Sequence, residues 1–316
     1  MLDKNVLLLE SVSDEADQLL RENVSLFRST APDTGGEIAS IHEIHAIITR
    51  GKGQVNQGLI DACSKLQLIA RCGVGLDNVD VVHASSRGVK VVNAPGINAD
   101  TVAEHALGLM LSLQRKLYHS FSAVKNNQWD YRKSYDGDEI RGKTLGILGM
   151  GNIGQKVARL AQAFGMEIIY WDIHPKDVSY PFVTFEEVLS LSHILSLHLP
   201  LVKETHKLIN AEAISHMNPY TILINSARGA IIDEHALTEA LQQNKIAGFG
   251  ADVLEVEPPS QDHPLLGLEN TLITPHSASL TAKTYNEMCV VTVQNTLSLL
   301  RGDTIHERFI FNRASL

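Results

Sequence analysis

Three polar residues of types that act on organic acids follow short apolar runs in the second half of the chain. They are Arg228 after Thr221–Asn225, Glu257 after Ala247–Ala251, and His276 after Thr271–Thr274. Arginine presents a planar fork of donors that matches a carboxylate. Histidine can take or give the proton of a hydroxyl group, and a carboxylate bonded to it stabilises the imidazolium and orients the ring. Together they are suited to binding a small organic acid and moving the proton of its 2-hydroxyl group.

Taken singly, each of these residues also has a simple structural interpretation. A histidine near a strand end is more often a hydrogen-bonded surface group, and the chain has 14 histidines. An exposed arginine or glutamate more often forms a solvated ion pair. Their shared placement after strands favours a catalytic role over the structural interpretation. The carboxyl ends of neighbouring parallel strands meet at one edge of a sheet, where ligands bind.

The residues in question must be positioned by strands and helices. Along the sequence, short apolar runs alternate with stretches whose apolar residues have the spacing of a helix. Expected strands are Val6–Glu10, Val24–Arg28, Ala46–Thr49, Leu66–Arg71 and Val89–Asn93, then Thr144–Leu148, Glu167–Trp171, His193–Leu197, Thr221–Asn225, Ala247–Ala251 and Thr271–Thr274. Expected helices are Asn56–Ser64, Ala99–Leu117, Ile153–Phe164, Glu234–Gln243 and Ala282–Leu300. Strands that are apolar on both faces and alternate with helices predict parallel sheets covered on both sides. The fold class is therefore α/β, with two doubly wound parallel-sheet domains.

A glycine-rich turn lies between an expected strand and an expected helix. The sequence Gly149-Met-Gly151-Asn-Ile-Gly154 directly follows the strand Thr144–Leu148. The first glycine permits a tight turn, the second lets the backbone approach a pyrophosphate, and the third allows close packing of the helix. Asp172 ends the next strand, where its carboxylate would accept ribose hydroxyls and repel a 2′-phosphate. The pattern predicts a Rossmann site that prefers NAD over NADP.

The chain length of 316 residues and the order of the elements predict two domains. The helix expected at Ala99–Leu117 would carry the chain from the first unit into the second. The final helix, Ala282–Leu300, could return to pack on the first unit. We therefore expect a discontinuous, smaller, flavodoxin-like substrate (catalytic) domain made of residues 1–98 and 280–316, and an NAD-binding Rossmann domain made of residues 99–279. We interpret the polar stretch Lys125–Arg141 as a loop between the domains.

The composition argues against several other classes of protein. The formal net charge is −9, so no global field favours nucleic acid or an anionic membrane as a partner. The three cysteines, Cys63, Cys72 and Cys289, are too scattered for a disulfide framework, and we expect them to be reduced and packed. No metal-ligand spacing stands out, so no metal is expected. No apolar stretch approaches the roughly 20 residues that cross a bilayer, and Val6–Leu9 is too short for a signal peptide, so we expect a cytoplasmic protein.

Several stretches, in the same order, resemble the D-isomer-specific 2-hydroxyacid dehydrogenases over nearly the whole chain. Besides the glycine-rich turn they are Gly73-Val-Gly-Leu-Asp-Asn-Val-Asp, Val92-Asn-Ala-Pro-Gly, Thr101-Val-Ala-Glu, Leu197-His-Leu-Pro-Leu, Asn225-Ser-Ala-Arg-Gly, Ala251-Asp-Val and Thr274-Pro-His. The resemblance implies that Arg228, Glu257 and His276 are catalytic. It favours Glu257 over Glu255, because the family's acid follows the aspartate at position 252 with this spacing.

The glycine-rich turn and the resemblance together imply a set of NAD contacts. The expected cofactor-binding residues are Gly149, Gly151, Asn152, Ile153, Gly154, Asp172, Leu199, Ser226, Ala227, Asp252, Ser277 and Ala278. Of these, Ser226 and Asp252 would lie near the nicotinamide and Leu199 near the adenosine. The loop around Val74 and Gly75 would meet the substrate carboxylate through backbone amides. The resemblance also implies a homodimer formed through the cofactor domains.

The identity of the substrate acid depends on positively charged residues other than Arg228. Arg50 and Arg71 lie at strand ends in the first series, and Arg132 lies in the polar stretch Lys125–Arg141. Further cations suggest a second anionic group on the substrate, and a phosphate is the obvious candidate. The arrangement resembles the phosphoglycerate dehydrogenase branch, which implies D-3-phosphoglycerate and 3-phosphohydroxypyruvate as the reacting pair, in serine biosynthesis. The structural alternative is that these arginines only form salt bridges.

Other activities of the same family remain open. A hydroxypyruvate or glyoxylate reductase would also act on a small anionic 2-keto acid. A formate dehydrogenase is disfavoured, because that branch carries glutamine where this chain has Glu257. An NADH-sensing, non-enzymatic corepressor would keep the three catalytic residues but typically adds partner-binding tails, which we do not expect here. We also expect no carboxy-terminal regulatory domain after Leu316.

Overall fold

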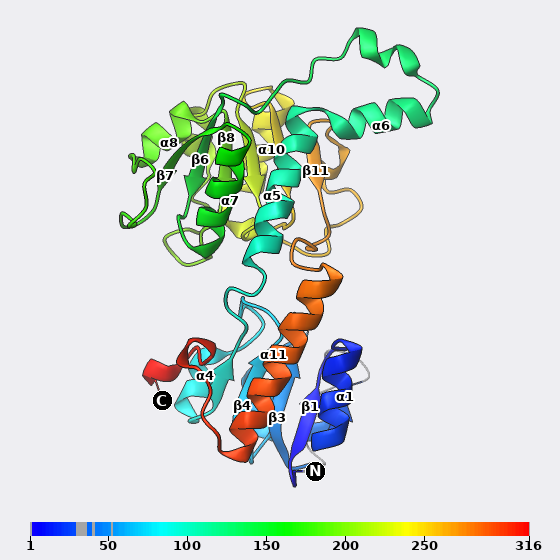
Figure 1. Cartoon of the computed structure of the whole chain (residues 1–316), viewed down its shortest axis with the longest axis vertical. Coiled ribbons are helices and arrows are strands. Elements are labelled where there is room, and N and C mark those ends of the chain that lie inside the picture. The colour runs from blue at the N-terminus through cyan, green and yellow to red at the C-terminus, as the bar shows by residue number, and fades with distance from the viewer. Residues whose placement is uncertain (1, 30–36, 40–41, 52, 316) are drawn as a thin grey trace. The chain divides into compact units, whose positions relative to one another are not determined.

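The computed structural model describes residues 2–29, 37–39, 42–51 and 53–315. The chain divides into two compact units (Figure 1). Unit 1 comprises residues 1–98 and 280–316, and unit 2 comprises Ala99–Ser279. Each unit contains one sheet in which every observed strand pair is parallel, which confirms the predicted fold class.

Unit 1 contains a five-stranded sheet with the order β2-β1-β3-β4-β5, a flavodoxin-like order. Its strands are β1 (Asn5–Leu8), β2 (Ser25–Arg28), β3 (Ile44–Thr49), β4 (Leu68–Arg71) and β5 (Lys90–Val92). Its helices are α1 (Asp14–Asn23), α3 (Gln57–Ala62), α4 (Val81–Ser86) and α11 (Ala282–Arg301). Val6 and Leu8 pack in one cluster with α1 and α11, whereas Leu7 packs with α3 and α4. Because side chains alternate along a strand, one apolar run fills both cores.

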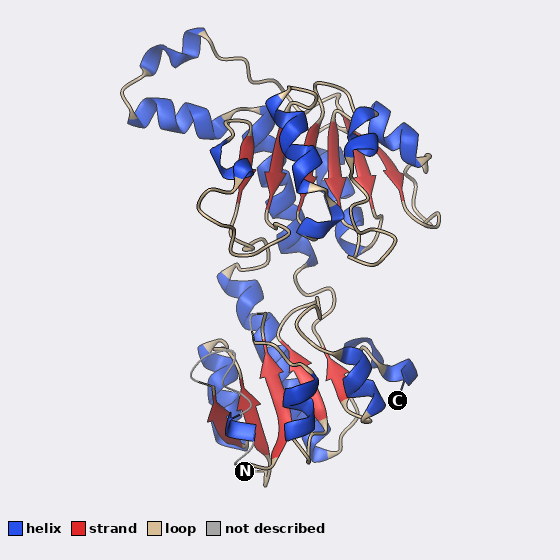
Figure 2. Cartoon of the chain, turned by 180° about the vertical axis from the view of Figure 1, so that it is seen from behind, coloured by secondary structure: helices blue, strands red, loops and turns tan. Residues whose placement is uncertain are grey.

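Unit 2 contains a six-stranded sheet with the order β11-β10-β9-β8-β6-β7. Its strands are β6 (Thr144–Leu148), β7 (Glu167–Trp171), β8 (Ile194–Leu197), β9 (Ile222–Asn225), β10 (Gly248–Ala251) and β11 (Thr271–Ile273). Its helices are α5 (Ala99–Gln114), α6 (Leu117–Lys125), α7 (Asn152–Ala163), α8 (Phe185–Leu191), α9 (Ala211–Ser215) and α10 (Glu234–Gln242). Helices lie on both faces of the sheet (Figure 2).

The two faces of the unit 2 sheet have separate cores. Ile222 and Ile224 of β9 pack with α5 and α7, whereas Leu223 packs with α8, α9 and α10. The chain runs from β6 to β7 on one side and then returns to β8 on the other side of β6. Ligands of such sheets bind beyond the carboxyl end of the strand where this reversal occurs.

Two predictions about the segment after α5 were wrong. The helix expected to reach Leu117 ends at Gln114, because Lys116 adopts a left-handed conformation with φ of 44° and α6 starts anew. The stretch Lys125–Arg141 belongs to unit 2 rather than to a loop between domains. It contains a 3-10 helix, η1 (Trp129–Lys133), and with α6 it projects from the sheet of unit 2 (Figure 1). Within the described residues, no helix is long and apolar enough to cross a membrane.

Candidate active site

The glycine-rich turn joins β6 to α7 at the reversal of strand order. Gly149 has a φ of 95°, and a side chain there would approach the backbone of His198 to 2.8 Å. A side chain on Gly154 would overlap the carbonyl oxygen of Gly149. Gly151 caps α7, and nothing lies within 4 Å of the place a side chain would take. The backbone edge is therefore open where a pyrophosphate would approach the start of the helix.

Asp172 follows β7 and turns back to brace this loop. Its Oδ2 accepts a hydrogen bond from the amide of Met150 at 2.9 Å. Its Oδ1 lies 3.4 Å from Nζ of Lys176, and the carboxylate side chain is 12% exposed. The carboxylate thus shapes the glycine-rich turn, and its contact with a ribose stays a prediction.

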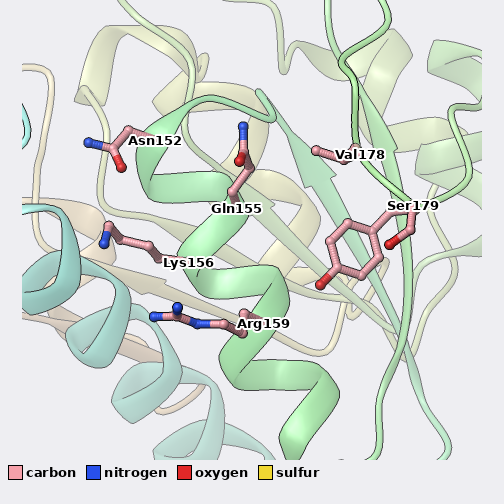
Figure 3. Close-up of a pocket in the computed structure, with 7 residues that line it drawn as sticks. Asn152, Gln155, Lys156, Arg159, Val178 and Ser179 are labelled. Carbon is pink, nitrogen blue, oxygen red and sulfur yellow. The ribbon is translucent and has the colours of Figure 1, made fainter.

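A hollow lies along the exposed side of α7 (Figure 3). Its volume is about 410 Å³, and it is lined by Asn152, Gln155, Lys156, Arg159, Val178, Ser179 and Tyr180. The ammonium group of Lys156 bonds to Asp100 at 2.7 Å, and the guanidinium of Arg159 lies 3.7 Å from the same carboxylate. Asn152 is the member of the expected cofactor set that lines this hollow, whereas Ile153 packs against the core. The predicted catalytic residues do not line it.

The turn after β9 presents Arg228. Asn225 is fully buried; its Nδ2 donates to the carbonyl of Arg228 at 2.9 Å, and its Oδ1 accepts from the amide of Ala227 at 3.0 Å. The hydroxyl of Ser226 is buried and has no hydrogen-bond partner within the described part of the chain. Buried polar groups are normally bonded, so such a hydroxyl fits a site that a ligand completes. The open edge at Gly151 and this hydroxyl both fit a bound dinucleotide.

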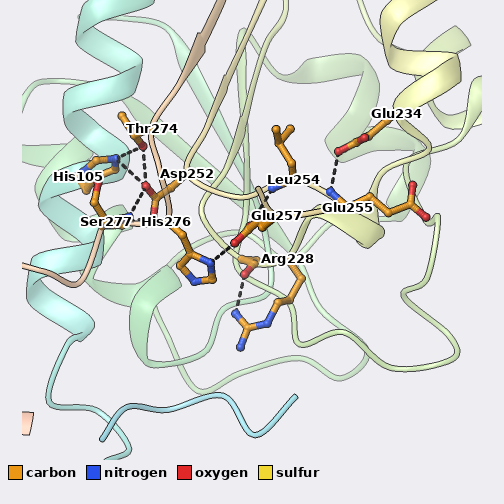
Figure 4. A network of polar contacts seen from close by, with 12 residues as sticks. His105, Arg228, Glu234, Asp252, Leu254, Glu255, Glu257, Thr274, His276 and Ser277 are labelled. Atoms are coloured by element: carbon orange, nitrogen blue, oxygen red, sulfur yellow. Dashed lines mark hydrogen bonds and ion pairs between the residues drawn. The ribbon is translucent and has the colours of Figure 1, made fainter. Parts of the chain in front are cut away.

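Glu257 and His276 hydrogen-bond to each other (Figure 4). Nδ1 of His276 lies 2.6 Å from Oε2 of Glu257, and Oε1 accepts from the amide of Leu254 at 3.0 Å. The side chain of His276 is 49% exposed and that of Glu257 is 34% exposed, so a small molecule can reach them. Burial opposes ionisation of Glu257, but the bonds from His276 and Leu254 and the charges of His276 and Arg228 outweigh it, so the pKa of Glu257 lies below its usual value. Arg228 is therefore close enough for its charge to act on Glu257.

Asp252 holds the segment that presents His276. The carboxylate is 2% exposed and accepts hydrogen bonds from the amides of Ser277 at 2.8 Å and Ala278 at 2.7 Å. His276 itself has a φ of 52°, and its amide donates to the carbonyl of Asp252 at 2.9 Å. The left-handed conformation is unfavourable for histidine and persists only where surrounding bonds impose it. Contacts of Asp252, Ser277 and Ala278 with the nicotinamide stay predictions.

The expected substrate residues of unit 1 lie at or after the carboxyl ends of β3 and β4, and Arg71 is the last residue of β4. Nη1 of Arg50 bonds to the hydroxyl of Tyr285 at 3.2 Å, and the guanidinium lies 5.4 Å from the centre of that ring. A side chain on Gly73 would overlap the guanidinium of Arg71, so this cation folds over the loop that leads to Val74 and Gly75. The guanidinium groups of both arginines therefore lie at the carboxyl edge of the unit 1 sheet.

The expected residues Arg132 and Leu199, and a histidine in the same motif as Leu199, have clear positions. Arg132 is exposed on η1 of unit 2, and its role with substrate stays a prediction. Leu199 is buried after β8. His198 bonds through Nε2 to Ser196 Oγ at 2.9 Å, and desolvation lowers the pKa of His198 to about 4. A neutral His198 is unsuited to donate a proton at neutral pH.

Sequence reasoning missed several supporting residues. Glu10 Oε2 accepts hydrogen bonds from the amides of Arg50 at 2.9 Å and Gly51 at 2.7 Å. Glu234 Oε1 accepts from the amide of Glu255 at 2.7 Å and holds the loop that carries Glu257. Glu10 lies two residues after the end of β1, so its place close to a strand end was the available signal. Among the described residues, no group of three or more metal-ligating side chains is arranged to hold a metal ion.

The chain is similar to known proteins of one enzyme family. Residues 107–278 match the family described as "D-isomer specific 2-hydroxyacid dehydrogenase, NAD binding domain". The chain is 38% identical over 290 residues to hydroxypyruvate reductase of Thermotoga maritima, covering 90% of this chain and 94% of that protein. It is 36% identical over 303 residues to D-3-phosphoglycerate dehydrogenase of Archaeoglobus fulgidus, covering 94% of this chain but only 57% of that protein.

A solved structure is also similar over nearly the whole chain. The TT0316 protein of Thermus thermophilus superposes with a TM-score of 0.88 at 35% identity, covering 95% of this chain and 97% of the other. The matched family domain lies entirely within unit 2, so NAD is the cofactor of that unit. The chain belongs to the D-isomer-specific 2-hydroxyacid dehydrogenase family of NAD-dependent oxidoreductases.

Proposed function

We propose that the protein is a D-2-hydroxyacid dehydrogenase that moves a hydride between NAD and C2 of a small 2-hydroxy or 2-keto acid. The observation that carries the proposal is the 2.6 Å bond between Glu257 and Nδ1 of His276, formed in an NAD-binding unit within electrostatic reach of Arg228.

The proposal gives a role to each of the three groups. An ionised carboxylate only accepts hydrogen bonds, so Nδ1 of His276 donates to Glu257 and leaves Nε2 for the substrate oxygen. When the hydroxy acid is oxidised, Nε2 takes the hydroxyl proton and Glu257 stabilises the imidazolium that forms. Arg228 binds the substrate carboxylate and polarises the oxygen on C2. The bound cofactor supplies or accepts the hydride.

Within this class we propose D-3-phosphoglycerate and 3-phosphohydroxypyruvate as the reacting pair, which places the enzyme in serine biosynthesis. Support comes from Arg50 and Arg71 at the carboxyl edge of unit 1, because two cations suit a second anionic group. The relatives divide between phosphoglycerate dehydrogenases and hydroxypyruvate or glyoxylate reductases. Reduction of hydroxypyruvate or glyoxylate is therefore the second candidate.

A substrate panel tests these proposals. Purified protein with NADH is offered 3-phosphohydroxypyruvate, hydroxypyruvate and glyoxylate, and NADH oxidation is followed by absorbance, with NADPH in parallel. The proposal expects the highest kcat/KM for the phosphorylated acid. Arg132→Ala and Arg50→Ala should then raise the KM of that acid about tenfold or more, with little change for glyoxylate. If the substitutions raise the KM of the phosphorylated acid and that of glyoxylate equally, these arginines do not bind a phosphate. If the protein binds NADH but reduces none of the three acids, it is an NADH sensor and not an enzyme.

We also propose that the protein is a homodimer formed through unit 2. The support is a group of large apolar side chains exposed on α6 and η1, since exposed apolar clusters commonly mark interfaces. They are Tyr118, Phe121, Val124 and Trp129. Light scattering coupled to gel filtration should give twice the chain mass. Phe121→Ser combined with Trp129→Ser should shift the mass toward that of one chain.

A further inference from the structure

His105 of α5 contacts the segment that presents His276, although it is remote from it in sequence. Its Nε2 lies 2.9 Å from Oγ1 of Thr274 and 3.7 Å from Oδ1 of Asp252 (Figure 4). The imidazole is 24% exposed, and Asp252 is 2% exposed. Solvent therefore screens these contacts only partly, which makes them stronger than surface contacts of the same length.

The chemistry of Thr274 fixes the direction of these hydrogen bonds. Its hydroxyl has one proton, and Oγ1 lies 2.6 Å from Oδ1 of Asp252, a short distance typical of donation to an ionised carboxylate. The hydroxyl therefore accepts from His105, so Nε2 of this ring carries a proton. The chain of donors runs from the imidazole through the hydroxyl to the carboxylate.

The same carboxylate holds the backbone on both sides of the catalytic histidine. Through Thr274 on one side and the amides of Ser277 and Ala278 on the other, Asp252 is bonded to residues that flank His276. These bonds oppose relaxation of the φ of 52° at His276. Relaxation would turn the ring away from Glu257.

We propose that His105 is a positioning residue that keeps His276 in its productive conformation by donating to Thr274 and supporting Asp252. The inference rests on the proposed dehydrogenase function for its kinetic consequence, but the structural consequence can be measured separately. The simpler alternative is that the imidazole only fills space between α5 and β11. Two variants distinguish these interpretations: one keeps a hydrogen-bond donor at position 105, and the other keeps only a side chain of similar volume.

The kinetic experiment compares His105→Gln, whose amide can still donate near the position of Nε2, with His105→Leu, which cannot. We expect kcat of His105→Leu to fall about tenfold with substrate KM nearly unchanged, and His105→Gln to stay within about threefold of the wild type. His216→Leu, which changes an exposed histidine on the same unit, is the matched control and should match the wild type. If both His105 variants lose activity equally, or neither does, the donor role is overturned.

A second measurement does not depend on turnover. Hydrogen exchange of the amides of His276, Ser277 and Ala278, followed by mass spectrometry, should accelerate in His105→Leu and not in His105→Gln. Unchanged exchange in His105→Leu would overturn the proposal even if activity fell. If the wild type reduced none of 3-phosphohydroxypyruvate, hydroxypyruvate and glyoxylate, the proposed function would be wrong. The comparison of hydrogen exchange between the two variants would still decide whether His105 holds residues 276–278 in place.

Discussion

At the scale of single residues, the backbone at His276 is held in a conformation that histidine seldom adopts. With a φ of 52°, the ring lies so that Nδ1 meets Glu257, and in the proposed function Nε2 is left for the substrate. Backbone strain of this kind costs about 1–3 kcal/mol and clusters at functional sites. Hydrogen bonds from His276, Ser277 and Ala278 to Asp252 oppose relaxation of this conformation.

Replacing His276 by alanine should separate proton transfer from cofactor binding. We expect kcat to fall roughly a hundred- to ten-thousandfold, because general acid–base catalysis supplies a factor of this size. The dissociation constant of NADH, measured by fluorescence titration, should change less than about threefold, since the ring acts on the substrate proton. A parallel loss of turnover and NADH affinity would contradict this role.

Replacing Glu257 by glutamine tests the carboxylate with almost no change in shape. The folded state lowers the pKa of Glu257, so its ionised form contributes stability that is fully present above the unfolded pKa of about 4.3 and is lost as pH falls through the folded pKa. The melting temperature of Glu257→Gln should therefore lie below that of the wild type near neutral pH, and the difference should shrink below about pH 4. Calorimetry across this range measures the difference, and a gap that widens on acidification would contradict the assignment.

The residues that follow strand ends were predictable, whereas those that act from other elements were not. Arg228, Glu257 and His276 each follow a short strand that is rich in apolar residues, so a local pattern locates them. His105 lies in the middle of a helix, and its contact with Thr274 exists only because α5 packs across β11. A residue whose role depends on tertiary packing leaves no periodic signal in the sequence.

At the scale of elements, the strands were predicted closely because a buried parallel strand is apolar on both faces. β6 and β7 have the predicted bounds, and the remaining strands differ by at most a few residues at an end. The short helices α1, α4, α6, α8 and α9 were missed, because five to ten residues give few repeats of a helical period. Capping residues could have revealed three of them. Thr184 and Glu187 form a capping box at α8, Asp80 caps α4, and Asn210 caps α9.

The turn between β6 and α7 permits a matched pair of alanine substitutions. A side chain on Gly154 would overlap the carbonyl of Gly149, so Gly154→Ala should destabilise unit 2 by roughly 1–3 kcal/mol. Gly151→Ala meets nothing within 4 Å, so this variant should fold normally and weaken NADH binding about tenfold or more, by filling the space of the pyrophosphate. Thermal unfolding and NADH titration of both variants give the comparison. Unimpaired NADH binding in Gly151→Ala would argue against the predicted pyrophosphate position.

At the scale of the whole molecule, unit 2 is continuous in sequence and unit 1 is not. The glycine-rich turn, Asp172, Ser226 and the Glu257–His276 pair all lie within Ala99–Ser279. Unit 1 instead depends on a segment that returns after residue 279, whose helix α11 packs against α1 and β4. The two units should therefore respond differently to loss of the last part of the chain.

A chain ended after Ser279 should keep NADH binding and lose turnover. The removed segment contributes Cys289, Val293, Leu297, Leu300 and Phe309 to the core of unit 1. Burial of a large apolar side chain is worth about 1.5–3 kcal/mol, so the combined loss is comparable to the whole stability of a domain, about 5–15 kcal/mol. Unit 1 should then unfold, as hydrogen exchange of β1, β3 and β4 would report, while NADH affinity stays close to that of the full chain. The segment Ala99–Ser279 alone is the control: if it folds but fails to bind NADH, the cofactor site needs unit 1 and the proposed division of roles between the units is wrong.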